Sequence, residues 1–145
     1  MVFLLNKNPI SNNNPFKSEV PNKIEIYHYA DYENHVVHFF IDPLSLNEAA
    51  EPLLIITEND GLVLFANMIK NAKRMSGALS ILKPEYVAFV YFNDNAEILD
   101  LYFSNTSNDN TSKGLFINKK DTHTGYYFRQ KDEQAFIEMF MGDIL

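Results

Sequence analysis

The sequence YVAFVYFNDNAEILDLYF, residues 86–103, carries the strongest strand pattern of the chain. Every residue from Tyr86 to Phe92 is apolar or aromatic, which is typical of a central strand covered on both faces. The polar run 93–95 favours a turn, and the residues from Glu97 to Phe103 can return as a second strand. We therefore predict an antiparallel hairpin at the centre of a sheet.

Two further strand pairs are predicted around this hairpin. Residues 23–30 alternate between two faces and residues 35–41 are rich in β-branched and aromatic side chains, so we expect them to pair around Glu33. Residues 114–118 and 125–130 flank a polar turn and predict a third pair. The apolar run 53–56 predicts one more strand, although periodicity alone does not separate it from the start of a helix.

Three helices are predicted from caps and from apolar spacing. Asp42 and Pro43 resemble an N-cap and a first helical residue, which begin a short helix. Residues 57–60 resemble a capping box, and apolar residues spaced by three and four from 62 to 76, followed by Gly77, predict a long helix. Residues 132–141 have acids in the first turn and an apolar side, which predicts a C-terminal helix.

Together these elements predict an α+β fold. We expect a mostly antiparallel sheet of five to seven strands, with one long central helix and a C-terminal helix packed on it. Residues 23–145 form this domain in our interpretation. Residues 1–22 are rich in Asn, Pro and Ser without an apolar period, so we expect a flexible arm, and residues 104–113 are expected to form a mobile polar loop.

The composition favours a protein of the cytoplasm. The chain has 145 residues, which fits one domain, and no cysteine, whereas small secreted domains are commonly cross-linked by disulfides. The apolar run after Met1 ends at Asn6, too early for a secretory signal. The most apolar stretch, residues 62–75, is interrupted by polar and basic residues, so we expect no membrane association.

The charge is distributed unevenly along the chain. The net charge is −7, and residues 23–60 alone contain one lysine against eight acidic residues. Such a surface repels phosphates, so we expect no direct nucleic-acid binding, and it attracts basic proteins. A solvated acidic face without a partner is the plainer alternative. The residues expected to contact a partner are Asp31, Tyr32, Glu33, Asp42, Glu48, Glu51, Glu58 and Asp60.

Two histidines offer an alternative that involves metal chemistry. If residues 23–41 form a hairpin, His28 and His38 lie opposite each other and could share a metal ion or a proton. A metal site needs three or four ligands, and His35 points to the other face of the strand. The acids Asp94, Glu97 and Asp100 lack the spacing of a calcium loop. We therefore predict no metal or cofactor, and keep a metal-dependent enzyme using His28 and His38 as the alternative.

The sequence contains none of the common catalytic signatures. No Gly-x-Ser-x-Gly elbow, no Gly-x-Gly-x-x-Gly and no phosphate-binding loop is present, so no nucleophile or nucleotide site is indicated. We therefore predict that the protein is not an enzyme.

The order of elements resembles a known class of proteins. The predicted elements follow in this order: a polar arm, a hairpin, a helix ending near Arg74, the aromatic hairpin 86–103, then Thr122–His123 and a final helix with Phe136 and Phe140. This order resembles immunity proteins of bacterial contact-dependent growth inhibition and related polymorphic toxin systems. The resemblance implies a small cytoplasmic inhibitor that covers one cognate toxin domain, frequently a nuclease and here expected to be basic. Contact residues vary among such proteins, so none is transferred. A peptide-binding adaptor that uses a sheet edge is a further alternative.

Overall fold

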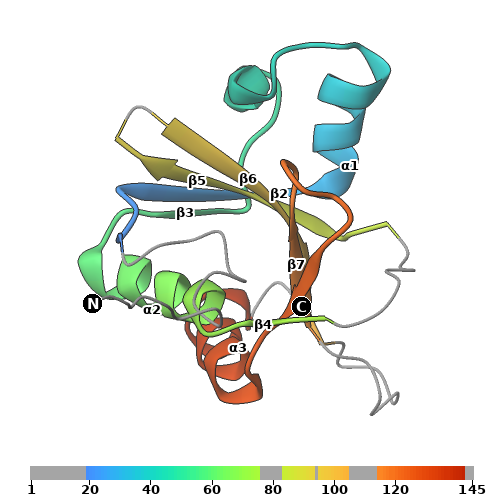
Figure 1. Cartoon of the computed structure of the whole chain (residues 1–145). Helices are drawn as coiled ribbons and strands as arrows, with labels where there is room; N and C mark the ends of the chain where they lie inside the picture. The colour runs from blue at the N-terminus through green and yellow to red at the C-terminus, as the bar shows by residue number, and fades with distance from the viewer. Residues whose placement is uncertain (1–18, 76–82, 94, 105–113, 143–145) are drawn as a thin grey trace, which may run out of the picture.

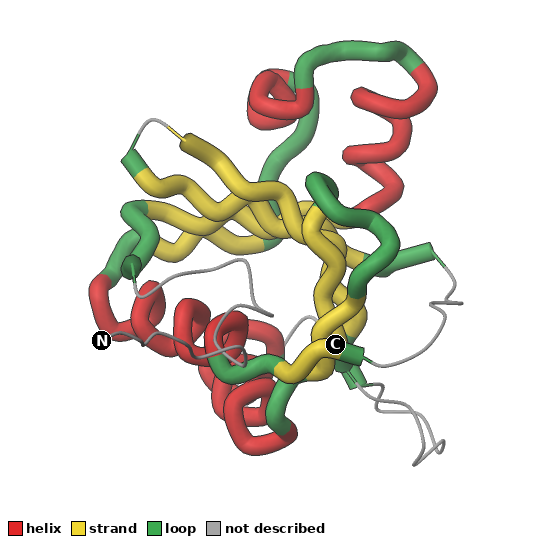
Figure 2. The backbone as a smooth tube through the Cα atoms, in the orientation of Figure 1, coloured by secondary structure: helices red, strands yellow, loops and turns green. Residues whose placement is uncertain are grey.

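The fold is an antiparallel sheet with helices on both faces (Figures 1 and 2). The computed structural model describes residues 19–75, 83–93, 95–104 and 114–142. Within these residues seven strands form one sheet, in the order β3-β2-β5-β6-β7-β8-β4, and every neighbouring pair is antiparallel. The predicted α+β class with a sheet of five to seven antiparallel strands is confirmed.

The central hairpin predicted from residues 86–103 is present. Its strands are β5 (Tyr86–Phe92) and β6 (Asn95–Tyr102), and they pair from Tyr86 opposite Leu101 to Phe92 opposite Asn95. The pair predicted near the C-terminus also forms. The other strands are β2 (Lys23–His28), β3 (Leu54–Ile56), β4 (Lys73–Arg74), β7 (Leu115–Asn118) and β8 (Gly125–Tyr127).

The larger core lies between one face of the sheet and three helical segments. These are α2 (Asn59–Lys70), α3 (Gln130–Phe136) and the π-helical η4 (Ile137–Met141). Phe65 of α2 and Phe136 of α3 are almost completely buried, and their ring centroids are 5.5 Å apart. Burying one such side chain contributes about 1.5–3 kcal/mol, so this core holds the helices on the sheet. The predicted C-terminal helix is confirmed.

A second, smaller core lies on the opposite face. It is covered by α1 (Tyr29–Tyr32), the π-helical η2 (Glu33–His38) and the 3₁₀ helix η3 (Pro43–Glu48). Its buried members are Tyr27, Tyr32, Leu46, Val87 and Phe89. The Asp42 carboxylate accepts a hydrogen bond from the Leu44 amide at 3.0 Å, so the predicted N-cap of this short helix is confirmed.

The hairpin predicted for residues 23–41 is wrong, because residues 29–38 are helical. β2 pairs instead with β5 and β3. Tyr29, Tyr32 and Val36 follow the helical spacing of three and four residues, and all three belong to the smaller core. Packing of this stripe on the sheet outweighs the strand preference of the β-branched residues.

The long central helix is also wrong in extent. α2 ends at Lys70, and Lys73 and Arg74 join the sheet as β4 beside β8. The capping box is not formed, because the N-cap is Glu58 and its side chain makes no capping hydrogen bond. Gly77, most of the predicted arm (1–18) and most of the predicted mobile loop (105–113) lie outside the described residues.

Among the described residues, every helix is too short or too polar to span a membrane.

Candidate protein-binding surface

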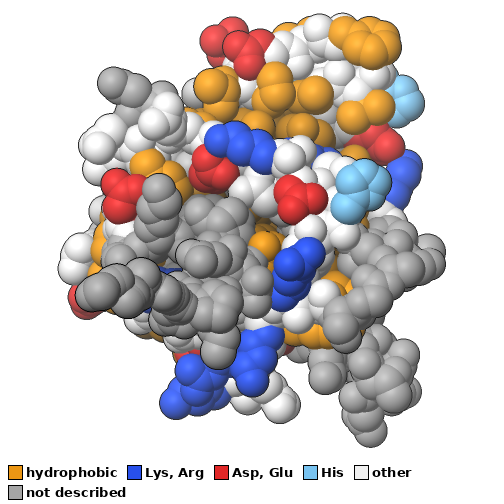
Figure 3. Space-filling model, viewed as in Figure 1, with side chains coloured by type: hydrophobic (Ala, Val, Ile, Leu, Met, Phe, Trp, Pro, Cys, Tyr) orange, Lys and Arg blue, Asp and Glu red, His pale blue; other side chains and the backbone are white. Residues whose placement is uncertain are grey.

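The connection from η2 to η3 exposes a cluster of large apolar side chains. Among the described residues, eight large hydrophobic side chains are exposed, and five of them fall between residues 37 and 44. We call these five the apolar segment: Val37, Phe39, Phe40, Ile41 and Leu44. Apolar side chains gather over this part of the molecule at the top of Figure 3, with acidic side chains beside them. Contiguous exposed apolar surface is a mark of an interaction site, whereas single exposed residues need no explanation.

Backbone hydrogen bonds hold this connection in one conformation. The Phe40 amide donates to the carbonyl of Val36 at 2.9 Å, and the Ile41 amide donates to that of His35 at 3.2 Å. The Ser45 amide donates to the Asp42 carbonyl at 3.1 Å. The amides of Phe40 and Ile41 thus bond back to η2, which limits the freedom of the connection.

A buried histidine ties the two helical segments together. The Nε2 atom of His35 lies 2.9 Å from Oγ of Ser45, and that hydroxyl donates to the Asp42 carbonyl at 2.8 Å. Because the hydroxyl proton is committed to Asp42, Nε2 of His35 is the donor in the other bond. The His35 residue is only 7% exposed, so this hydrogen bond connects η2 to η3 beneath the apolar segment.

Phe40 combines two unusual properties. Its φ angle is 56°, in the left-handed region, and it is 90% exposed. The other described non-glycine residue with positive φ is Asn93 (54°) in the β5–β6 turn, and Asn tolerates this region because its short side chain bonds locally. An aromatic residue does not share that advantage, and an exposed ring gains little from packing. The positive φ belongs to the end of η2, because Phe40 follows the C-cap Phe39 and its amide bonds back to Val36 as in an αL helix end. The exposed aromatic ring at a position that usually takes Gly or Asn is the feature that the fold does not account for.

The acidic residues of the predicted partner surface fall on two sides of the sheet. Asp31 and Glu33 lie on α1 and η2, whereas Asp42, Glu48 and Glu51 lie on or beside η3. These helical segments contact one another, so the five acids lie on the same side of the sheet as the apolar segment. Two predicted members lie elsewhere, at the start of α2 on the opposite face: Glu58 and Asp60. Tyr32, the aromatic member, is 6% exposed and packs on Phe89, so it supports the surface from below.

Ion pairs use some of these acids and leave others available. Glu33 pairs with Lys83 at 2.8 Å, and this hydrogen-bonded partner lowers the pKa of Glu33. Asp42, Glu48 and Glu51 are exposed and form no ion pair within the part of the chain that the structure describes. Their charge is therefore available to an approaching molecule.

A buried polar cluster lies under α1. Lys119 Nζ lies 3.0 Å from Oδ2 of Asp100 and 5.1 Å from the ring centroids of both Tyr29 and Tyr32. The other carboxylate oxygen of Asp100 is buried without a hydrogen-bond partner among the described residues. Burial raises the pKa of Asp100, and Lys119 opposes part of that rise. Burial, with Asp100 nearby, also raises the pKa of Tyr102 to about 12.

This cluster holds α1 on the sheet, because cations over tyrosine rings are attracted to the ring faces. The sequence offered one indication of it. Asp100 is a charged residue inside the otherwise apolar run 98–101. Burying an unpaired charge in a strand covered on both faces is costly, so such a residue indicates a partner of opposite charge.

A second buried carboxylate belongs to the same face. The hydroxyls of Tyr27 and Tyr91 both donate to Oε1 of Glu25 at 3.1 Å, and Lys23 pairs with its other oxygen at 3.2 Å. Burial first, and then the nearby Glu25, raise the pKa of Tyr91 to about 12. These hydrogen bonds account for the buried charge as part of the framework.

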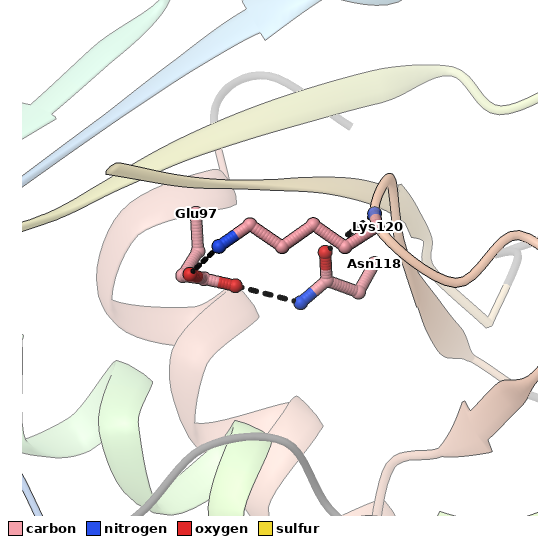
Figure 4. Close-up of polar contacts among 3 residues, drawn as sticks. All are labelled: Glu97, Asn118 and Lys120. Carbon is pink, nitrogen blue, oxygen red and sulfur yellow. Dashed lines mark hydrogen bonds and ion pairs between the residues drawn. The ribbon is translucent and has the colours of Figure 1, made fainter. Parts of the chain in front are cut away.

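Two of the three acids considered for a metal site are engaged in ion pairs. Glu97 accepts hydrogen bonds from Asn118 at 2.9 Å and from Lys120 at 2.7 Å, as Figure 4 shows. Asp100 pairs with Lys119, and Asp94 lies outside the described residues. No group of three or more His, Asp or Glu side chains suitable for a metal ion occurs among the described residues.

The predicted His28–His38 pair is wrong as geometry. His28 ends β2, and residues 29–38 form a continuous helical stretch that ends at His38. A helix stands between them in place of the two paired strands, so the two side chains do not face each other across a hairpin. The His28 ring instead stacks on Tyr86, with 5.9 Å between ring centroids.

The structure thus defines a small α+β domain with an exposed apolar segment and acidic residues around it. A family model described as YhfM protein matches residues 32–143. Because this match covers more than half of the chain, the chain belongs to the YhfM protein family. No curated protein and no solved structure matches it.

Proposed function

We propose that this protein works by stoichiometric binding. It forms a one-to-one complex with a basic protein domain and inhibits it, as immunity proteins of polymorphic toxin systems inhibit their toxins. The observation that carries the proposal is the position of Asp42, Glu48 and Glu51, which are exposed, form no ion pair within the described residues and lie beside the apolar segment.

Each part of this surface has a physical role in such a complex. Clustered carboxylates speed the encounter with a basic protein and disfavour acidic ones. Apolar side chains supply free energy as they leave water, about 25 cal/mol for each Å² buried. The sequence has no Lys or Arg between residues 24 and 69, so a basic partner meets no repulsion from this segment. The lack of cysteine supports a cytoplasmic place of action.

The alternatives have less support. A metal-dependent enzyme built on His28 and His38 required a hairpin, and those residues flank a helix instead. An adaptor that binds peptides along a sheet edge has short edges at its disposal, because β3 has three residues and β4 has two. Peptide addition at an edge gains affinity from a row of main-chain hydrogen bonds, which such edges limit.

Co-expression tests the proposal directly. The chain is expressed with the carboxy-terminal domain of a toxin-like reading frame that neighbours its gene, and growth is recorded. We expect growth to recover, purified toxin activity to fall to zero at one equivalent, and light scattering to show a one-to-one complex. The proposal fails if no such reading frame adjoins the gene and no basic protein co-purifies, or if excess chain leaves the toxin active.

A further inference from the structure

We propose that Phe40 is the anchor of this surface: its ring enters an apolar pocket on the partner, and the rim of that pocket carries Lys or Arg. The inference deepens the proposed function, on which it rests, by naming the recognition residue and the chemistry of the surface that it recognises.

The first argument is the cost of presenting this side chain. Phe40 holds a positive φ of 56° and leaves 90% of the residue in water. This φ closes the end of η2, a position that usually takes Gly or Asn. A Phe there costs backbone strain, and strained residues cluster at ligand clamps and switch regions. The comparable position in the β5–β6 turn is occupied by Asn93, a residue suited to that conformation. An exposed aromatic ring in the same conformation gains its contacts from another molecule.

The second argument is preorganisation. The amides of Phe40 and Ile41 bond back to η2 at 2.9 and 3.2 Å, and the His35–Ser45 hydrogen bond of 2.9 Å fixes η3 against η2. A loop that is already ordered loses less conformational entropy when it binds. The ring is thus presented ready for insertion, and His35 and Ser45 act as positioning residues.

The third argument is charge complementarity, which selects the partner. A single protruding aromatic ring requires a pocket, and aromatic anchors surrounded by weaker contacts are typical of binding hot spots. Val37, Phe39, Ile41 and Leu44 supply that surrounding apolar contact. Asp42, Glu48 and Glu51 are exposed beside these apolar side chains. Their negative charge favours basic residues on the rim of the partner's pocket. A lipid surface with anionic headgroups is disfavoured by the same charges.

The test uses a random 16-residue peptide library displayed on phage, panned against the full-length chain. Peptides that bind are synthesised and measured against the wild type and Phe40→Asn, a substitution that removes the ring and keeps a residue suited to positive φ. Met139→Gln is the matched control, because Met139 is 60% exposed on η4. We expect peptides that combine aromatic or aliphatic residues with Lys or Arg, and at least tenfold weaker binding to Phe40→Asn than to Met139→Gln.

Three results would overturn the inference. Peptides that bind Phe40→Asn as tightly as the wild type would place the preferred site elsewhere. Selected peptides without an excess of Lys and Arg would remove the charge argument. A wild-type dimer in analytical ultracentrifugation that dissociates in Phe40→Asn would make the apolar segment a contact between copies of this chain. Because none of these measurements uses the natural partner, they succeed or fail independently of the toxin co-expression test.

The positioning role has its own readout. Ser45→Ala removes the hydroxyl that bonds to His35, and residue 40 remains Phe. We expect threefold to tenfold weaker peptide binding together with faster hydrogen exchange at the Phe40 and Ile41 amides, and wild-type exchange in β5. Unchanged exchange at those two amides would overturn the role of His35 and Ser45.

Discussion

At the scale of single residues, Lys119 is the side chain whose loss we expect to cost most. Its ammonium group pairs with buried Asp100 and lies over the rings of Tyr29 and Tyr32. Removing one partner of a buried pair leaves an uncompensated charge, so Lys119→Met is expected to lower the free energy of unfolding by about 3 kcal/mol in urea titrations. Lys120→Met is the control, because Lys120 pairs with Glu97 at the surface, and it should cost about 0–1 kcal/mol. Equal losses would contradict this assignment.

The same variant should show a characteristic pH dependence. Burial already raises the pKa of Asp100, and Lys119 opposes part of that rise. Without Lys119 this pKa rises further, so the native state binds a proton more readily than the unfolded chain does. The stability associated with this protonated carboxyl is present below the unfolded pKa and is lost as the pH rises through the folded pKa.

Lys119→Met should therefore lose more stability relative to the wild type at pH 8 than at pH 4.5. Urea titrations across this range give the measurement. The double variant with Asp100→Asn should lack this extra dependence. A cost of Lys119→Met that is constant with pH would show that Asp100 stays charged, or that the lysine acts through packing alone.

The strain at Phe40 makes a prediction about stability as well as binding. Because Phe40 is 90% exposed, Phe40→Asn loses little burial and gains a residue suited to φ of 56°. We expect the free energy of unfolding to stay level or rise by about 1 kcal/mol. The reciprocal change, Asn93→Phe in the β5–β6 turn, should lower it by about the same amount. A substantial destabilisation by Phe40→Asn would mean that the ring already contributes to the fold.

At the scale of elements, local patterns predicted the strands and failed where distant packing decides. The β5–β6 and β7–β8 pairs and the C-terminal helix follow from apolar runs, turns and caps that lie close together in the sequence. Residues 35–41 were predicted as a strand because Val36, Val37 and Phe39 favour strands locally. The helical stripe of Tyr29, Tyr32 and Val36 gains its advantage only when it packs on the sheet. The two-residue β4 could not be predicted from local patterns for the same reason, since its partner β8 lies more than fifty residues away in the sequence.

The junction of β3, α2 and η4 is sensitive to added volume at Gly61. A Cβ atom at Gly61 would lie 2.6 Å from Cζ of Phe140 and 2.7 Å from Cγ2 of Ile56. Gly61→Ala therefore requires the Phe140 ring and the Ile56 side chain to shift, and we expect a loss of about 1–3 kcal/mol in thermal unfolding. Gly142→Ala is the matched control, because the nearest atoms there are 3.9 Å away. If the two variants unfold alike, the junction is looser than this packing indicates.

At the scale of the whole molecule, the sheet decides which predicted site residues can act together. The sequence showed the excess of acids in residues 23–60 and could not show on which face each lies. Glu48 and Glu51 follow η3, whereas Glu58 and Asp60 begin α2 on the other side of the sheet. The apolar segment could not be predicted for a related reason. In the sequence, residues 35–41 resemble a buried strand, whereas in the structure α1 and η2 form there and leave Phe39 and Phe40 exposed.

This separation predicts an asymmetry in binding kinetics. Exposed charges are screened beyond about 8 Å at physiological salt, so only acids near the apolar segment should attract a basic partner towards Phe40. The double variant Glu48→Lys/Glu51→Lys should slow association with a selected basic peptide at least several-fold and weaken its salt dependence, while dissociation changes little. Glu58→Lys/Asp60→Lys changes the net charge equally, and should leave the association rate close to the wild-type value. Stopped-flow measurements from 25 to 300 mM salt separate the two variants. If both slow association to the same degree, net charge rather than the surface around η3 controls the encounter.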